Sequence, residues 1–193
     1  CGDLVSSSVA PNSQVAKPSD STANTDNAFR GELLLVGCHG WDEATTSKTP
    51  KGLDVPHLIK YPAPVRNAFS SPSSTFFFAL LTDGTLYGMG RNNHGQLGLG
   101  DLATKEVPGQ VPTASFSAPI RKVATGKTHS IILLENGTVY GMGANSSGQL
   151  GLGEGSRASA DVLVPTLLPL EDIRDIACGS EFTIACSNTG KLL

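Results

Sequence analysis

The chain has 193 residues and a net charge of −3, and only 16% of its residues are charged, below the roughly 25% usual in globular domains. Glycine and proline are frequent, with 22 and 12 copies, but the glycines follow no three-residue period, which excludes collagen. No run of 18 apolar residues occurs, so we expect no membrane-spanning helix, and the slightly acidic balance gives no global field that would attract nucleic acid.

The first segment, residues 1–28, is rich in Ser, Thr, Asn, Ala and Pro and has few apolar side chains. This composition cannot bury enough apolar surface to fold alone, so we interpret it as a disordered tail. Residues 29–193 form a second region of different character. Early in that region, residues 42–64 contain several prolines and predict a long irregular loop with one short strand near residues 55–59.

A repeat of 53 residues runs through residues 29–193. The segment from Gly84 to Gly90 returns from Gly137 to Gly143, and the two copies differ only in Leu86 against Val139. Repeat units begin near the hairpin glycines at positions 31, 84, 137 and 190. A repeat of this length is typical of stacked structural units, so it has to be explained before any single residue is.

Each repeat unit is predicted to form four short strands. In the clearest copy they cover residues 120–125, 129–134, 138–143 and 162–168, where β-branched and apolar residues predominate. Asn136-Gly137 predicts a type I′ hairpin turn, because Asn and Gly tolerate positive φ angles. Four strands joined by glycine-rich turns indicate a propeller blade, so the predicted fold is all-β, a partial β-propeller of four-stranded blades.

The sequence Gly-Gln-Leu-Gly-Leu-Gly occurs twice and has a structural interpretation. Its glycines allow sharp turns, its first leucine fills space between blades, its glutamine bonds to backbone groups, and the preceding asparagine suits a left-handed or Asx-turn position. His129 follows the same repeat register and is interpreted as a partly buried structural residue. The repeat residues are Gly90, Asn92, Gly95, Gln96, Leu97, Gly98, Gly100, Gly143, Asn145, Gly148, Gln149, Leu150, Gly151, Gly153 and His129.

No arrangement of residues predicts catalysis, a cofactor or a metal ion. Gly126-Lys127-Thr128 lacks the glycine that a phosphate-binding loop needs five positions earlier, where Arg121 stands. The four cysteines contain no Cys-x-x-Cys pair, and Cys178 and Cys186 are either buried free thiols or partners across a hairpin. Candidate contacts with a protein partner are the loop residues Arg91, His94, Asp101, Lys105, Glu154 and Arg157.

These residues resemble the regulator of chromosome condensation repeat family. The resemblance rests on Gly90 to Asp101, Gly143 to Gly153 and Ala124 to Ser130, and it covers about residues 31–193. Within the family it is strongest to the second member, a mitotic passenger-like protein. It implies a seven-bladed β-propeller with repeats staggered against the blades. The chain starts with Cys1 and stops inside an expected strand, so we expect an N-terminal fragment comprising about half of the ring.

The resemblance implies three alternative functions. The first is a protein-binding scaffold that acts in mitosis or the cytoskeleton with small GTPases, without being an enzyme. The second is a guanine-nucleotide exchange factor for a Ran-, Rac- or Ral-type GTPase, and the third is a propeller module of a larger ubiquitin ligase. Chromatin or microtubules are further possible partners by family, and the implied location is intracellular, at the nucleus, chromosome or cytoskeleton or in the cytoplasm. No small-molecule substrate and no membrane association are expected.

Overall fold

A computed structural model of the protein describes residues 31–38, 52–153 and 161–192. The tail predicted at residues 1–28 and the candidate contacts Glu154 and Arg157 lie outside these ranges. The described part of the chain consists of strands and connections without a helix, which agrees with the all-β prediction. Accordingly, no described helix is available to cross a membrane.

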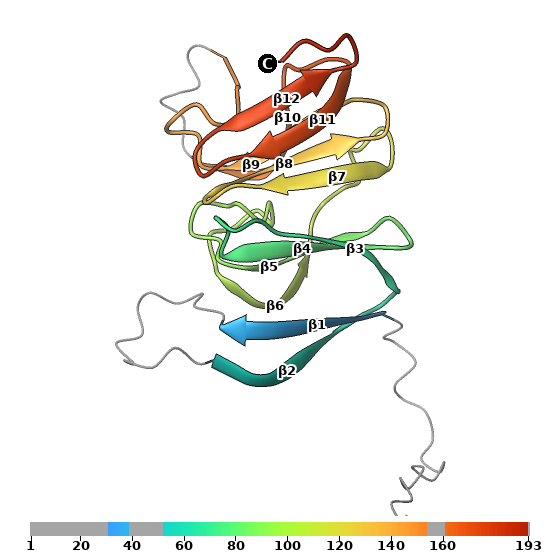
Figure 1. The fold of residues 1–193 in the computed structure, drawn as a ribbon, viewed down its shortest axis with the longest axis vertical. Helices are drawn as coiled ribbons and strands as arrows, with labels where there is room; N and C mark the ends of the chain where they lie inside the picture. Colours follow the sequence, from blue (N-terminus) through green and yellow to red (C-terminus); the bar gives the residue numbers. More distant parts are fainter. Residues whose placement is uncertain (1–30, 39–51, 154–160, 193) are drawn as a thin grey trace, which may run out of the picture.

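The strands form four antiparallel sheets that follow one another along the long axis of the molecule (Figure 1). The first sheet pairs β1 (Gly31–Cys38) with β2 (Gly52–Tyr61). The second has the order β3-β4-β5-β6, with bounds Val65–Phe69, Phe76–Leu81, Leu86–Gly90 and Lys105–Gln110.

The third sheet contains β7, β8, β9 and β10 in consecutive order, with bounds Ile120–Thr125, His129–Leu134, Val139–Gly143 and Val162–Leu167. These are the four strands predicted for the clearest repeat unit, shifted by one residue at two of the ends. The fourth sheet pairs β11 (Ile173–Cys178) with β12 (Thr183–Ser187). The structure is therefore a partial β-propeller with two complete four-stranded blades.

The repeat units are staggered against the sheets. The units begin at the hairpin glycines, just before the third strand of a blade, so β1 and β2 hold the third and fourth positions of a blade, whereas β11 and β12 hold the first and second. The stagger implied by the family resemblance is therefore present. The strand predicted at residues 55–59 is in fact the ten-residue β2, because β1 pairs with it from Gly31 opposite Tyr61 to Cys38 opposite Gly52. That pairing overrides the local signal of Pro56, which an edge strand tolerates.

The core lies between successive sheets. The central strand β4 is buried along its whole length, and its side chains alternate between the cores on its two sides. Phe76 and Phe78 pack with Ile132 of β8, while Phe77 and Leu81 belong to the cluster shared with the first sheet. Burying each such side chain contributes about 1.5–3 kcal/mol, so the stacking of sheets is the main source of stability. Continuous apolar runs in β4 and β8 are the sequence signature of this arrangement.

The antiparallel order gives the molecule two distinct faces. We call the first the loop face; it carries the described connections at 70–75, 91–104, 126–128, 144–153 and 179–182. We call the second the hairpin face; it carries the connections at 82–85, 111–119, 135–138, 168–172 and 188–191. Because β7 contacts both β3 and β11, the first strands of successive blades form a continuous row between these faces.

The hairpin turns differ from the type I′ prediction. Gly84, Gly137 and Gly190 have φ angles of 86°, 82° and 81°, but Asp172 is the only non-glycine residue with positive φ in the described ranges. The Gly84 amide donates to the Leu81 carbonyl at 3.0 Å. Each turn is therefore a three-residue loop with one left-handed glycine, since only one position needs positive φ in that geometry.

Candidate partner-binding face

The two Gly-Gln-Leu-Gly-Leu-Gly loops lie on the loop face and are closed by buried asparagines. Oδ1 of Asn92 accepts a hydrogen bond from the Leu97 amide at 2.9 Å, and Nδ2 donates to the Asp101 carbonyl at 2.8 Å. Oδ1 of Asn145 accepts from the Leu150 amide at 3.0 Å in the second copy. Both asparagines have negative φ and reach five residues ahead, so the predicted left-handed or Asx-turn role is wrong. Their side chains instead close the whole loop.

The position of the glutamine, which is the same in both loops, also has a local reason. Oε1 of Gln96 accepts a hydrogen bond from the His94 amide at 2.9 Å, and Oε1 of Gln149 accepts from the Ser147 amide at 2.9 Å. Both glutamine side chains are buried. Leaving a backbone amide without a hydrogen-bond partner destabilises the fold, so each glutamine stabilises the turn before it by accepting the bond from that turn's amide.

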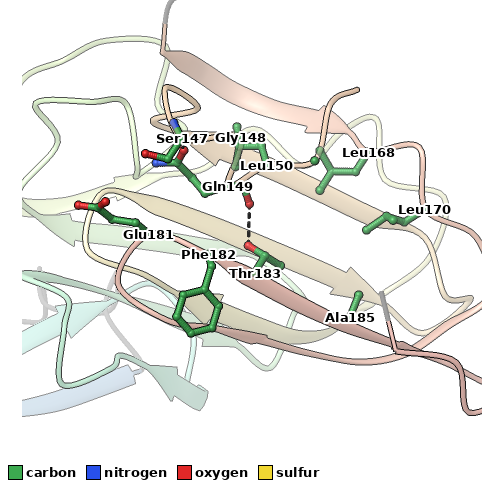
Figure 2. A pocket seen from close by; sticks show the side chains of 11 residues that line it. Ser147, Gly148, Gln149, Leu150, Leu168, Leu170, Glu181, Phe182, Thr183 and Ala185 are labelled. Atoms are coloured by element: carbon green, nitrogen blue, oxygen red, sulfur yellow. Dashed lines mark hydrogen bonds between the residues drawn. The ribbon is translucent and has the colours of Figure 1, made fainter. Parts of the chain in front are cut away.

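The same loops connect neighbouring sheets through hydrogen bonds. Oγ of Ser130 on β8 donates to the Gln96 carbonyl at 2.8 Å. Oγ1 of Thr183 on β12 donates to the Gln149 carbonyl at 2.8 Å, the interaction drawn as a dashed line in Figure 2. The loops are thus bonded both within their own blade and to the next one.

The motif glycines and leucines complete this arrangement. A Cβ at Gly98 would lie 2.3 Å from Sδ of Met142, so the close approach of the next blade requires glycine there. Leu97 is buried in the cluster between the second and third sheets, and Leu150 in the cluster between the third and fourth. Eight motif glycines have positive φ: Gly90, Gly95, Gly98, Gly100, Gly143, Gly148, Gly151 and Gly153.

His129 is fully buried and bridges the third and fourth sheets. Its Nε2 atom lies 3.1 Å from Oγ1 of Thr183. Because Thr183 uses its proton to bond to the Gln149 carbonyl, His129 donates through Nε2. Burial lowers the pKa of His129 to about 4, so the side chain is neutral near pH 7. It packs between the blades and joins them through this hydrogen bond.

The described candidate contact residues Arg91, His94, Asp101 and Lys105 follow β5 towards β6 on the loop face. Nδ1 of His94 lies 3.0 Å from Oδ2 of Asp161, which precedes β10, so this candidate contact residue is paired with the next blade. Nζ of Lys105 lies 2.7 Å from Oδ2 of Asp101. This hydrogen bond is the main reason why the pKa of Asp101 is lowered.

A polar groove of about 610 Å³ lies on the loop face. It is lined by residues of five connections, among them Ser73, Arg91, Lys127, Ser147 and Glu181. The volume lies within the range of about 300–1,000 Å³ that is typical of ligand-binding clefts. Of the described candidate contacts, Arg91 and His94 line the groove, whereas Asp101 and Lys105 do not, and Ser73, Lys127 and Glu181 were not among the candidates. These residues could have been found from the alternation of antiparallel strands. It places the turns between first and second strands on the same face as the loops that follow the third strands.

A smaller cavity of about 200 Å³ lies between the third and fourth sheets (Figure 2). Leu168 and Leu170 line one end of it, and Ser147 and Glu181 lie towards the other. Phe182 also lines this cavity. The cavity is mainly apolar and below the usual size of a ligand-binding cleft.

The described residues include no group of three or more His, Cys, Asp or Glu side chains placed to hold a metal ion. Cys178 and Cys186 are free thiols, because Cys178 lies opposite Thr183 and Cys186 opposite Asp175 in the sheet register. The alternative of a disulfide across this hairpin is therefore wrong. Burial raises the pKa of Cys178 to about 11, which makes a reactive thiolate unfavourable.

The fold and the loop face define a repeat-built β-propeller whose surface loops are fixed by hydrogen bonds between blades. A family model described as "Regulator of chromosome condensation (RCC1) repeat" matches residues 83–133 and 136–186, more than half of the chain. A second model of the same description matches residues 120–149. The chain belongs to the RCC1 repeat family.

Related proteins include the Protein RCC2 homolog of Danio rerio, which is 33% identical over 177 residues, covering 84% of this chain and 35% of that protein. Shorter matches at 36% identity include the human probable E3 ubiquitin-protein ligase HERC3, covering 58% of this chain and 11% of that protein. The X-linked retinitis pigmentosa GTPase regulator of Canis lupus familiaris matches at 36% identity over 55% of this chain and 11% of that protein. The chain thus spans about a third or less of these relatives.

Solved structures show the same fold. Prp20p from Saccharomyces cerevisiae, whose structure was described with its binding properties to Gsp1p and histones, is 25% identical with a TM-score of 0.59. That match covers 71% of this chain and 34% of Prp20p. The structure of Kap60 bound to yeast RCC1 (Prp20) matches at 22% identity with a TM-score of 0.63, covering 91% of this chain and 44% of that one.

Proposed function

We propose that this chain forms part of a protein-binding propeller scaffold that acts with a small GTPase. The observation that carries the proposal is the polar groove on the loop face, to which five connections from three sheets contribute. Its loops are fixed by hydrogen bonds from Asn92, Gln96 and Ser130 and their counterparts, so the surface is organised before a partner arrives. Preorganisation of this kind lowers the entropic cost of binding.

The choice of a small GTPase rests on the relatives. Prp20p has binding properties towards Gsp1p, and another relative is a GTPase regulator. The role in mitosis or the cytoskeleton with a GTPase of the Ran, Rac or Ral type, which the family resemblance implies, is part of the same proposal. We propose an intracellular location, at the chromosome, nucleus or cytoskeleton. The division into a tail at 1–28 and a propeller region at 29–193 is part of the same proposal.

Exchange-factor activity is the second candidate. An exchange factor acts by binding the nucleotide-free GTPase and requires no catalytic triad, so the same loop face serves either function. The third candidate is a propeller module of a ubiquitin ligase. It is supported by the similarity to HERC3, which covers 58% of this chain. We rank it below the others because any ligase chemistry would belong to another domain.

The experiment combines GTPase binding with nucleotide release. Ran, Rac and Ral, each loaded with a fluorescent GDP analogue, are mixed with the full chain, and direct binding is measured by biolayer interferometry. We expect binding to one of them without faster release of nucleotide. Accelerated release would favour the exchange factor, and absence of binding to all three would overturn the GTPase proposal.

A charge-reversal pair identifies the surface in the same assay. Lys127 lines the groove, whereas Lys60 is exposed on β2. We expect Lys127→Glu to weaken binding about tenfold, the effect of losing a well-placed charge pair at an interface, and Lys60→Glu to change it by less than about twofold. Equal effects of the two variants would show that the GTPase does not bind at the groove.

A further inference from the structure

The first strand of each described blade contains one residue more than its partner strand. In the second sheet Val65 pairs with Leu81, but Asn67 already pairs with Leu80. Ile120 and Lys122 pair with Leu134 and Leu133 in the same way, and Ile173 and Asp175 with Ser187 and Cys186. The extra residues are Arg66, Arg121 and Arg174. All three blades therefore place an arginine at the same irregularity.

The repeat period alone conceals this equivalence. Arg121 and Arg174 are 53 residues apart, but Arg66 precedes Arg121 by 55. The difference arises because the segment from Val65 to Phe76 is two residues longer than the segment from Ile120 to His129. Pairing with the second strand, rather than sequence spacing, shows that the three positions correspond.

The three arginines lie along the hairpin face, on the side opposite to the groove. Each is the second residue of β3, β7 or β11, and each of these strands is the end strand of its sheet. The three strands lie in successive layers of the molecule, and β7 contacts both neighbours (Figure 1). All three arginines are exposed. An extra residue of this kind commonly redirects a side chain and recurs at functional positions.

The neighbouring carboxylates are bonded elsewhere, and none of the three guanidinium groups has an ion pair with a side chain that the structure describes. Oδ1 of Asp175 lies 2.7 Å from Nζ of Lys122, and Oδ1 of Asp172 accepts a hydrogen bond from Asn188 at 2.6 Å. Arg174 contacts the sulfur of Cys186 at 3.5 Å. No carboxylate whose side chain the structure describes lies at ion-pair distance from Arg66 or Arg121. The charge of Arg121 contributes to the lowered pKa of Asp175, but the carboxylate is bonded to Lys122, so both guanidinium groups keep donors for an external anion.

We propose that Arg66, Arg121 and Arg174 form an arginine row that binds an acidic segment of a protein partner. A guanidinium group presents a planar fork that matches a carboxylate. Stacked sheets lie about 10 Å apart, close to the roughly 9 Å that three residues of a polyproline II helix span, with every third side chain on the same side. The row therefore fits a segment in polyproline II conformation with Glu or Asp at every third position. The net charge of −3 and the interspersed Asp172 and Asp175 favour this partner over the continuous phosphate backbone of a nucleic acid.

The test uses fluorescence anisotropy with the full chain and a fluorescein-labelled peptide that has glutamate at every third position and serine or glycine elsewhere. The triple variant Arg66→Gln, Arg121→Gln, Arg174→Gln removes the row. The control Lys60→Gln, Lys105→Gln, Lys191→Gln removes the same charge at positions outside both the row and the groove. Each exposed charge contact contributes a factor of about two to three, so we expect the first triple to weaken binding about tenfold and the control to change it by less than about twofold.

A single variant and a control peptide test whether the guanidinium groups and the carboxylates make the contact. The single variant Arg121→Lys keeps the charge but loses the fork, and we expect a partial loss of affinity. A peptide with glutamine in place of glutamate should not bind. Thermal melting by circular dichroism checks the fold of each variant, and if the triple variant unfolds early, the single variants Arg66→Gln and Arg121→Gln replace it.

Three results would overturn the proposal. The first is equal weakening by both triple variants, and the second is absence of binding by the unmodified chain. The third is tighter binding of a DNA duplex than of the glutamate peptide through the same arginines, which would make the row a nucleic-acid surface. None of these results depends on the GTPase proposal, because that proposal concerns the opposite face.

Discussion

The third and fourth sheets have equivalent repeat positions in different surroundings. Ile131 on β8 is 0% exposed, whereas Ile184 on β12, 53 residues later, is 37% exposed. His129 is 0% exposed, and its equivalent Phe182 is 56% exposed. The residue types remain compatible with a core, so the repeat sequence by itself does not decide burial.

The difference comes from the neighbouring strands. Strand β8 lies between β7 and β9 and has a sheet on each side. Among the described residues, β12 pairs with β11 and otherwise through one bridge between Cys186 and Leu192. Propeller blades therefore form locally from the repeat pattern but gain most of their burial from the next strand and the next blade. This is the behaviour expected of repeat proteins, whose stability is a sum of units and interfaces.

The largest effect should come from equivalent core truncations. We expect Ile131→Ala to lower the free energy of unfolding by about 3 kcal/mol, because it removes fully buried methyl groups and leaves a cavity. Ile184→Ala should cost less than about 1 kcal/mol, since this side chain is partly solvated. Urea unfolding of both variants measures the difference. Equal losses would contradict the comparison.

The buried histidine should make stability depend on pH. The pKa of His129 is about 4 in the folded protein against 6.5 for an ordinary histidine, so between these values the unfolded chain binds a proton that the folded one does not. Stability is therefore lost as the pH falls through this window, by up to about 3 kcal/mol. The variant His129→Phe introduces the phenylalanine that stands at the equivalent positions 76 and 182. It should make the free energy of unfolding less dependent on pH in this window.

Urea unfolding at several pH values compares His129→Phe with the unmodified chain. Other titrating groups contribute equally to both curves, so the difference between the curves reports His129. Identical slopes between pH about 6.5 and about 4 would show that burial does not control this proton.

The smallest effect should come from the ion pair between the third and fourth sheets. Nζ of Lys122 lies 2.7 Å from Oδ1 of Asp175, and both side chains are exposed. We expect Lys122→Ala to lower stability by about 0.5 kcal/mol at low salt and by less at high salt, because exposed pairs are weak and screened. Thermal melts at two salt concentrations measure this, with Lys127→Ala as the control. A loss of several kcal/mol would instead make this pair a principal contact between the sheets.

The repeat allowed the sequence to predict much of the fold. A 53-residue period, apolar runs and turn glycines placed the strands of the third sheet within one residue, because these signals are local. The ten-residue β2 and the identity of the turns were missed. Both depend on pairing across strands, where β1 extends β2 and Gly84 alone supplies the left-handed position.

Less of the candidate site was predictable. The sequence placed Arg91, His94, Asp101 and Lys105 on loops, but the pairing of His94 with Asp161 joins residues 67 positions apart. Glu181 was missed because its turn carries no distinctive pattern, and Lys127 because its motif was considered only as a phosphate-binding loop. Arg66 escaped detection because a connection two residues longer breaks the 53-residue register.

Hydrogen–deuterium exchange of the full chain, with and without the GTPase that it binds, tests the central claim most directly. Binding at the loop face predicts slower exchange of the backbone amides at 91–104, 126–128 and 144–153, with the hairpin turns at 82–85 and 135–138 unchanged. Amides in loops bonded to the next blade, such as Leu97 and Leu150, should already be slow without the partner. Protection confined to the hairpin turns would contradict the account.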